Sequence, residues 1–216
     1  MRKYLSVLVL ALAVFLGSCS DNTSRATGIY MLMDTSGTYA KELNKAQDII
    51  KYLLGTLQSG DSFAVARIDT GSFSEKDIIA KVMFDNRPSI ANQQKRAFAA
   101  QIDKFVKSVK GSRYTDITGG ILQATEYLNE AGAGKKHILI YSDLQEDIKK
   151  GYVRDIPFDI PKFNVIALNV TKLRADNVDP RVYLTRLENW EKRIKDGGGK
   201  WKVVNDMDRL ESMLAN

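Results

Sequence analysis

Three short clusters of oxygen-bearing side chains are the residues of this sequence best suited to chemistry. They are residues 34–38 (Asp-Thr-Ser-Gly-Thr), residues 115–116 (Thr-Asp) and residues 142–143 (Ser-Asp). The clusters offer carboxylates and hydroxyls, without any nitrogen or sulfur ligand. Such oxygen donors suit a small hard cation such as Mg²⁺, which takes near-octahedral oxygens and keeps some of its waters. The sequence therefore predicts a divalent-cation site built from these clusters.

The scarcity of cysteine and histidine excludes other kinds of site. The 216 residues include one Cys, at position 19, and one His, at position 137. Zinc sites built from several Cys and His, and frameworks of paired cysteines, are therefore ruled out. A Ser-His-Asp enzyme would depend on His137 alone. This residue begins an apolar run beside two lysines, and we interpret it as structural or exposed.

Alternating strands and helices must position the clusters. Apolar runs predict strands at residues 28–33, 62–69, 80–84, 137–141, 163–170 and 201–204. Apolar residues at helical spacing predict five helices, at residues 43–57, 88–109, 116–128 (or 118–128), 181–195 and 207–214. The stretch at 145–162 is expected to be irregular. This alternation predicts an α/β class: a Rossmann-like, doubly wound, mostly parallel central sheet with helices on both faces. The strand at 80–84 is expected to be a short edge strand.

Two of the clusters directly follow predicted strands, and the third precedes a helix. In an open parallel sheet, ligands bind beyond the carboxyl ends of the strands. Side chains alternate in direction along an extended chain, so Asp34, Ser36 and Thr38 can point the same way if their loop is extended. The plain alternative is that each cluster serves as a helix N-cap or a turn, where Ser, Thr and Asp are preferred.

Together the clusters resemble the von Willebrand factor A domain and its metal-ion-dependent adhesion site. The family pattern is D-x-S-x-S after the first strand, a Thr before a later helix and an Asp after the next apolar strand. The matching residues are Asp34, Ser36, Thr38, Thr115 and Asp143, with Thr38 standing where Ser is usual and keeping the hydroxyl. The order of the elements agrees with the family from about residue 27 to the C-terminus.

The resemblance implies a role for each of these residues. The hydroxyls of Ser36, Thr38 and Thr115 would bind a reversibly held Mg²⁺ or Mn²⁺ directly. Asp34 and Asp143 would act directly or through water. One coordination position would stay open for a carboxylate from a protein partner, so the resemblance implies association and no catalytic residue.

An enzyme of a different class is the alternative. The run M-L-M-D-T-S-G-T also resembles the nucleophile loop of the haloacid dehalogenase-type phosphatases and phosphotransferases. Asp34 would then form an aspartyl-phosphate, and Asp143 with Asp147 would hold Mg²⁺. Three departures count against this reading. Thr115 follows the polar loop K-G-S-R-Y, whereas the phosphate-binding Ser or Thr of that family ends an apolar strand. Ser36 replaces the second Asp of the hydrolytic phosphatases, and Thr35 replaces the Lys of the P-type ATPase motif.

The first 18 residues read as a lipoprotein signal peptide. Arg2 and Lys3 precede a mostly apolar stretch at 4–16, which is too short to span a bilayer. The stretch ends in L-G-S-C, which resembles a bacterial lipobox with Gly17 where Ala or Ser is common. The resemblance implies that Cys19 becomes the lipidated first residue of the mature protein and anchors it to the membrane.

The remaining chain divides into residues 19–26, the lipidated Cys with a short polar linker, and residues 27–216, a single von Willebrand A-like domain. The seven linker residues 20–26 reach at most about 25 Å, so the domain should lie close to the membrane. Ser20 does not match the common Asp signal for inner-membrane retention. We therefore expect a lipid-anchored protein of the cell envelope, with the outer membrane favoured over the inner.

The balance of charge argues against a nucleic-acid partner. The chain has 32 Lys+Arg and 26 Asp+Glu, and acidic and basic residues alternate along the predicted helices. Nucleic-acid binding would instead favour a basic stripe. The sequence thus predicts a membrane-anchored bacterial lipoprotein that binds an unidentified protein partner through a Mg²⁺ or Mn²⁺ site.

Overall fold

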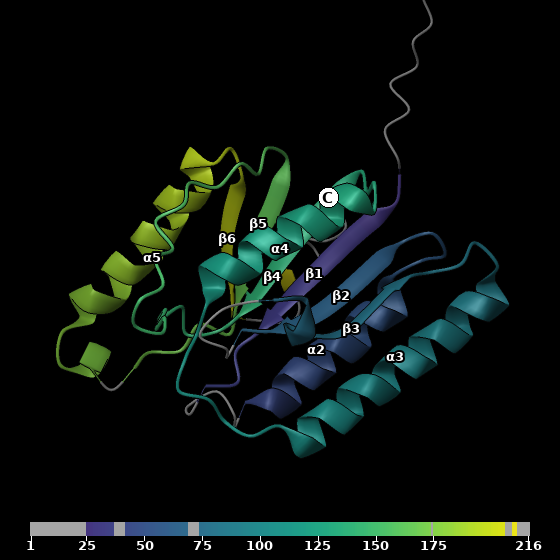
Figure 1. Ribbon diagram of the computed structural model, residues 1–216, viewed down its shortest axis with the longest axis horizontal. Coiled ribbons are helices and arrows are strands. Elements are labelled where there is room, and N and C mark those ends of the chain that lie inside the picture. The colour runs from purple at the N-terminus through teal and green to yellow at the C-terminus, as the bar shows by residue number, and fades with distance from the viewer. Residues whose placement is uncertain (1–24, 37–41, 69–73, 174, 206–208, 211–216) are drawn as a thin grey trace, which may run out of the picture.

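Among the residues that the structure describes, six strands form one central sheet (Figure 1). This computed structural model describes residues 25–36, 42–68, 74–173, 175–205 and 209–210. The strand order is β3-β2-β1-β4-β5-β6, and all neighbours are parallel except β2 and β3. The strands are β1 (Thr27–Met33), β2 (Ser62–Arg67), β3 (Ile78–Met83), β4 (Lys135–Tyr141), β5 (Phe163–Leu168) and β6 (Lys200–Val204).

This architecture confirms the predicted α/β class with its mostly parallel sheet. The short edge strand is also confirmed, although β3 begins two residues earlier than expected. Strand β1 is almost continuously apolar, and so is β4 from Ile138 onward, because helices cover both faces of the sheet and bury these side chains.

In the part of the chain that the structure describes, four long helices cover the sheet in pairs. They are α2 (Leu43–Thr56), α3 (Pro88–Ser108), α4 (Ile117–Glu130) and α5 (Pro180–Asp196), and two short 3₁₀ turns are η3 (Glu75–Asp77) and η4 (Ala175–Asn177). Pro88 and Pro180 each occupy the first turn of a helix, where the missing N–H costs no hydrogen bond. Gly198, at φ +81°, follows α5 in the left-handed conformation that ends helices.

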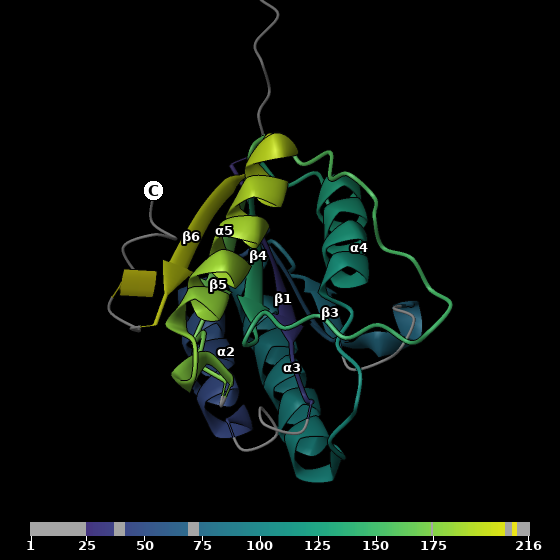
Figure 2. The ribbon, with the colours of Figure 1, turned by 90° about the vertical axis from the view of Figure 1, so that its left-hand side faces the viewer.

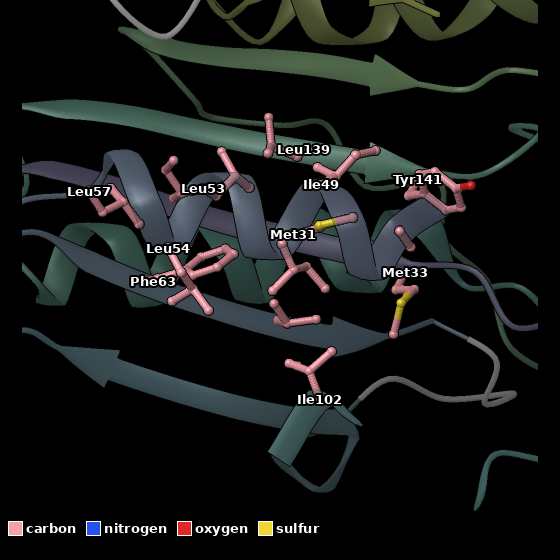
Figure 3. Packing of buried hydrophobic residues seen from close by; sticks show 14 of the residues in the cluster. Met31, Met33, Ile49, Leu53, Leu54, Leu57, Phe63, Ile102, Leu139 and Tyr141 are labelled. Atoms are coloured by element: carbon pink, nitrogen blue, oxygen red, sulfur yellow. The ribbon is translucent and has the colours of Figure 1, made fainter. Parts of the chain in front are cut away.

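One face of the sheet packs against α2 and α3. In Figure 3, Leu53 of α2 lies over β1 and β4, near Met31 and Leu139, which are all fully buried. Phe63 of β2 stacks on Phe98 of α3 with ring centroids 4.8 Å apart. The opposite face packs against α4 and α5, where Trp190 and Ile194 are buried, as expected for a core stripe.

The connection from β4 to β5 is long and irregular, as predicted. It runs from the carboxyl edge of the sheet back to the amino edge, on the face that α4 and α5 cover (Figures 1 and 2). Its apolar residues Leu144, Phe158 and Ile160 are buried against the α4–α5 face. The connection therefore belongs to the core of the domain even though it lacks regular secondary structure.

His137 is a buried residue of β4, with 1% of its surface exposed. Neither ring nitrogen has a hydrogen-bond partner in the described part of the chain. Burial, assisted by the charge of Lys135, lowers the pKa of His137 to about 4. The residue is therefore a neutral structural side chain, which agrees with the first of the two sequence interpretations.

Several sequence predictions fall outside the described residues. They are the signal peptide, the lipidated Cys19, most of the linker, Thr38 and most of the predicted helix at 207–214. Within the described ranges, no helix combines the length and apolarity needed to cross a bilayer.

Candidate metal centre

Asp34 lies immediately beyond β1 and is fully buried. Its backbone N–H donates to the carbonyl of Tyr141 at 2.9 Å, which continues the pairing of β1 with β4 past the end of β1. Both carboxylate oxygens accept hydrogen bonds: Oδ1 from the Ser36 N–H at 2.8 Å, and Oδ2 from the Ser142 hydroxyl at 2.7 Å. The carboxylate is therefore held in a fixed orientation by groups at the ends of two neighbouring strands.

Asp143 lies beyond the end of β4, next to Asp34, and only 5% of its surface is exposed. Its Oδ1 accepts a hydrogen bond of 2.8 Å from the Gln145 N–H. Burial raises the pKa of Asp143 to about 6, and the nearby charge of Asp34 adds to that rise. Within the described residues no Lys or Arg forms an ion pair with this carboxylate. The edge of the sheet thus holds two buried carboxylates close together.

Two backbone bridges bring the remaining loops to the same edge. Thr115 exchanges hydrogen bonds of 2.8 and 3.0 Å with Asp147, which ties the loop before α4 to the segment after Asp143. The Ser112 N–H donates to the carbonyl of Thr35 at 3.2 Å, which ties the same loop to the segment after β1.

Four of the five predicted ligands lie among the described residues, at or near this edge of the sheet. Asp34 and Asp143 lie on neighbouring strand ends, and the segments carrying Ser36 and Thr115 are bridged to them. The side chain of Thr115 is buried, and that of Ser36 is partly exposed. The fifth predicted ligand, Thr38, lies outside the described residues.

Asp116, beside Thr115, has a structural role. Its side chain caps α4 by accepting a hydrogen bond of 2.8 Å from the Gly119 N–H. Arg154 also contacts this fully buried carboxylate with two nitrogens, Nε at 3.1 Å and Nη2 at 2.8 Å. The capping interpretation of this residue is thus confirmed. The sequence gives no signal for Arg154, which lies in the irregular connection 38 residues away.

A second polar network, also missed by the sequence reading, supports the segment that follows Asp143. Glu146 accepts hydrogen bonds from the Thr118 N–H at 2.7 Å and from the Thr118 hydroxyl at 3.0 Å. Arg193 of α5 lies 3.8 Å from Glu146 and stacks over the Trp190 ring. Trp190 in turn donates to the Leu144 carbonyl at 3.0 Å. Helices α4 and α5 thereby fix the path of the chain just after the candidate ligand.

The aspartyl-phosphate alternative requires a carboxylate oxygen of Asp34 that a substrate can reach. In the structure both oxygens accept hydrogen bonds and the residue has no exposed surface. Asp147, the second carboxylate of that alternative, contributes backbone hydrogen bonds to Thr115 and has an exposed side chain. This geometry gives a substrate no access to the carboxylate of Asp34 and therefore counts against its nucleophilic role.

The donor chemistry of the edge fits a hard divalent cation. The described part of the chain nowhere groups three His, Cys, Asp or Glu side chains in a metal-binding arrangement. A cation here would therefore depend on hydroxyls in addition to Asp34 and Asp143. Hydroxyl and carboxylate oxygens are the ligands that Mg²⁺ and Mn²⁺ accept.

Comparisons with known proteins identify the fold. No protein-family model matches the sequence, and no curated protein matches it. Solved structures do match. A von Willebrand factor type A protein from Catenulispora acidiphila superposes with a TM-score of 0.53 at 15% identity, covering 88% of this chain and 41% of that one. The pilus adhesin SpaC from Lactobacillus rhamnosus GG gives 0.56 at 13% identity, covering 91% and 30%.

The chain spans less than half the length of either of these proteins. Identities of 13 and 15% establish the fold alone. The six-stranded sheet, its order and its antiparallel edge strand are accordingly those of a von Willebrand A-like fold.

Proposed function

We propose that this domain binds a protein partner through a divalent cation, Mg²⁺ or Mn²⁺, held at the carboxyl edge of its sheet. Asp34, Ser36, Thr115 and Asp143 would hold the ion together with Thr38. The observation that carries the proposal is the pair of buried carboxylates, Asp34 and Asp143, set among hydroxyl-bearing loops. Two such carboxylates are costly to bury without a compensating cation.

The chain's own residues would keep this site in place. Ser142 orients Asp34 through its hydroxyl, and Gln145 orients Asp143 through its N–H. The hydrogen bond from Trp190 to Leu144 fixes the turn that follows Asp143. A cation held by these residues would supply an electrophile for a carboxylate oxygen of the partner. The reaction is then association, with no covalent bond made or broken.

Fold likeness to an adhesin supports a binding role. SpaC, which matches this fold over most of the present chain, is described as a pilus adhesin. The fully hydrogen-bonded and unexposed carboxylate of Asp34 supports a non-enzymatic role for the same edge.

The proposal includes the membrane anchor predicted from the sequence. Residues 1–18 would be removed, and Cys19 would carry the lipid that holds the domain at the cell envelope, preferably at the outer membrane. Because Cys19 is the only cysteine, Cys19→Ala should abolish acylation and processing. A Cys19→Ala protein that still enters detergent at the mature mass would contradict the anchor.

The experiment for partner binding is capture from cell-envelope membranes with and without EDTA. The wild-type protein and Thr38→Ser should retain one partner in an EDTA-sensitive manner, because both keep the hydroxyl. Thr38→Ala and Asp34→Ala should lose that partner. Equal recovery by all four proteins, with and without EDTA, would show that the metal loops are not the binding surface.

A further inference from the structure

The C-terminal part of α3 carries a row of basic side chains. We call this row, with its continuation in the following loop, the α3 cations: Lys104, Lys107, Lys110 and Arg113, all exposed. Lys104 and Lys107 are three residues apart in the helix, so they lie on the same side of it, about 4.5 Å apart along its axis. Lys110 and Arg113 continue this spacing through the loop that connects α3 to α4. The row therefore leads from the helix into the loop that carries the predicted ligand Thr115.

The α3 cations lie at the same end of the domain as the candidate metal centre. In both views α3 and β1 finish at the same end of the sheet (Figures 1 and 2). The loop after α3 is tied there, because the Ser112 N–H donates to the Thr35 carbonyl at 3.2 Å. Ser112 directly precedes Arg113, and Thr35 lies between the predicted ligands Asp34 and Ser36. The row therefore ends beside the loops that would hold the metal.

Two further cations lie on the segment that is bridged to Thr115. The backbone hydrogen bonds between Thr115 and Asp147 place this segment at the metal edge. Lys149 and Lys150 follow shortly after Asp147, and both are exposed. Basic side chains thus occur on both chain segments that meet at Thr115.

These six cations are not neutralised by neighbouring acids. Within the described residues none of them forms an ion pair. Among the acids of segments 103–113 and 145–150, Asp103 accepts a hydrogen bond from Gln47 and Glu146 accepts two from Thr118, which leaves Asp147 as an exposed acid outside any ion pair. Helix α5 differs, because each of its five basic residues lies within 4 Å of a carboxylate. The two segments beside the metal loops therefore carry a clear excess of positive charge.

The row also borders a hollow of about 440 Å³ between β3 and α3. Lys76 and Lys104 line it together with the side chain of Phe105. Arg67 and Asp77 line it as well and lie 3.6 Å apart in an ion pair. Lys76 is exposed and, like the α3 cations, forms no ion pair with a described residue. The hollow therefore offers a recess in which an acidic side chain can lie between two lysines.

This excess charge would persist when the metal is bound, because Asp34 and Asp143 would offset the two charges of the ion. A single exposed ion pair contributes little to affinity. Several cations grouped together, however, attract an oppositely charged partner and speed its association. The surface beside the metal loops is therefore complementary to a partner that carries several negative charges close together.

We propose that the partner's metal-binding carboxylate belongs to an acidic segment, whose neighbouring Asp and Glu side chains pair with the α3 cations and with Lys149 and Lys150. This inference rests on the proposed function, and it adds the chemical class of the partner. Nucleic acid is the other polyanion that a basic row attracts. The cell-envelope location of the proposed function favours the acidic protein segment.

The test uses the full chain in a non-ionic detergent and two fluorescein-labelled decapeptides. One consists of glutamate alone, and the other consists of glycine and serine with a single central glutamate. Both offer a carboxylate to the metal, but only decaglutamate can also pair with the cations. In Mg²⁺, fluorescence anisotropy should show that decaglutamate binds more tightly by about tenfold, since several exposed pairs each change the affinity by about twofold.

Two triple variants with the same change in net charge test where this preference arises. The first, Lys104→Glu, Lys107→Glu and Lys110→Glu, should bind the two peptides with equal affinity. The control, Lys162→Glu, Lys200→Glu and Lys202→Glu, changes exposed lysines at the start of β5 and along β6, and it should keep the preference. A melting temperature that still rises with Mg²⁺ verifies that each variant retains its fold and its metal site.

The outcomes separate the acidic segment from the metal-mediated function. Equal affinities of the wild type for the two peptides, or loss of the preference in both triple variants or in neither, would overturn the acidic segment. Tighter binding of a single-stranded DNA oligonucleotide than of decaglutamate, in EDTA as well as in Mg²⁺, would overturn it in favour of nucleic acid. A preference that persists in EDTA and that the first variant abolishes would support the acidic segment and overturn the metal-mediated function.

Discussion

The hydroxyl of Ser142 donates a hydrogen bond of 2.7 Å to the carboxylate of Asp34, across 108 residues of sequence. Ser142 follows β4 and Asp34 follows β1, so the contact exists because these two strands are parallel neighbours in register. It joins the first and third predicted clusters within the buried part of the site, since both residues are fully buried.

Ser142→Ala should therefore destabilise the domain. The change leaves one oxygen of a buried carboxylate without its donor, which costs about 1–3 kcal/mol. Urea denaturation in EDTA gives the free energy of unfolding. Ser108→Ala is the control, because Ser108 is exposed and its hydroxyl bonds only to its own helix. Equal losses of unfolding free energy in the two variants would show that the hydrogen bond to Asp34 does not stabilise the domain more than an exposed serine hydroxyl does.

Divalent cations should raise the melting temperature of the wild-type domain. A ligand that binds only the native state stabilises it by mass action. Asp34→Ala should abolish the rise with Mg²⁺ or Mn²⁺. Differential scanning fluorimetry over a millimolar titration measures it, with EDTA as the reference. A wild-type melting curve unmoved by Mg²⁺, Mn²⁺ and Ca²⁺ would rule out the metal site.

Asp143→Asn should weaken metal binding without lowering the stability of the metal-free domain. Burial and the charge of Asp34 raise the pKa of Asp143 from 3.8 to about 6, so its carboxylate form is disfavoured in the native state. This penalty is absent below pH 3.8 and complete above pH 6, where it reaches about 3 kcal/mol. In EDTA at pH 7, Asp143→Asn should thus be at least as stable as wild type, yet respond less to Mg²⁺. A less stable variant with an unchanged Mg²⁺ response would contradict both parts.

His137→Leu should remove a pH dependence of stability. The pKa of His137 falls from 6.5 to about 4 on folding, so between these values the unfolded chain binds more protons. Stability from this residue is complete above pH 6.5 and is lost as the pH falls toward 4, by about 3 kcal/mol. Chemical denaturation at pH 4.5, 5.5 and 7 gives the free energy of unfolding, which should depend less on pH in His137→Leu. Both proteins carry Asp143→Asn, because Asp143 contributes a pH dependence of opposite sign. Parallel pH profiles would contradict the buried, neutral state of His137.

Arg154→Ala should be costly, and Arg181→Ala should not. Both arginines contact an aspartate with two nitrogens, but Asp116 is fully buried whereas the pair of Arg181 with Asp179 is exposed. Removing Arg154 leaves a buried carboxylate without its cation, at a cost of about 3 kcal/mol. An exposed pair contributes little because water screens it. Comparison of the two free energies of unfolding tests the difference, and similar losses would contradict it.

Much of the fold could be predicted because burial leaves a clear pattern in the sequence. The strands β1 and β4 are apolar runs that end abruptly at Asp34 and Ser142, and parallel strands bring such ends together. The predicted start of the edge strand β3 lies two residues after its observed start at Ile78. An edge strand is only partly buried, so its apolar pattern does not mark its ends clearly.

The supporting contacts of the site could not be predicted. Arg154 and Glu146 lie in an irregular connection, where no periodicity fixes the direction of a side chain. Their partners Asp116 and Thr118 are 38 and 28 residues away along the chain. Such contacts arise only when tertiary folding brings the connection across α4. The sequence indicated which residues could serve as ligands, but gave no information on which residues orient them.

The outer strands of the described sheet, β3 and β6, are the places where a second copy of the protein could pair with this one. An open sheet exposes unpaired backbone groups along each outer strand, and a second copy can add a strand there. Here β6 carries the exposed Lys200 and Lys202, whereas β3 carries the exposed Lys81, which pairs with Glu75 at 3.5 Å. Strand addition would bring these lysines against their own counterparts in another copy. Like-charge repulsion along β6 therefore disfavours strand pairing between copies, and it would do so even where the proposed lipid anchor crowded them together in two dimensions.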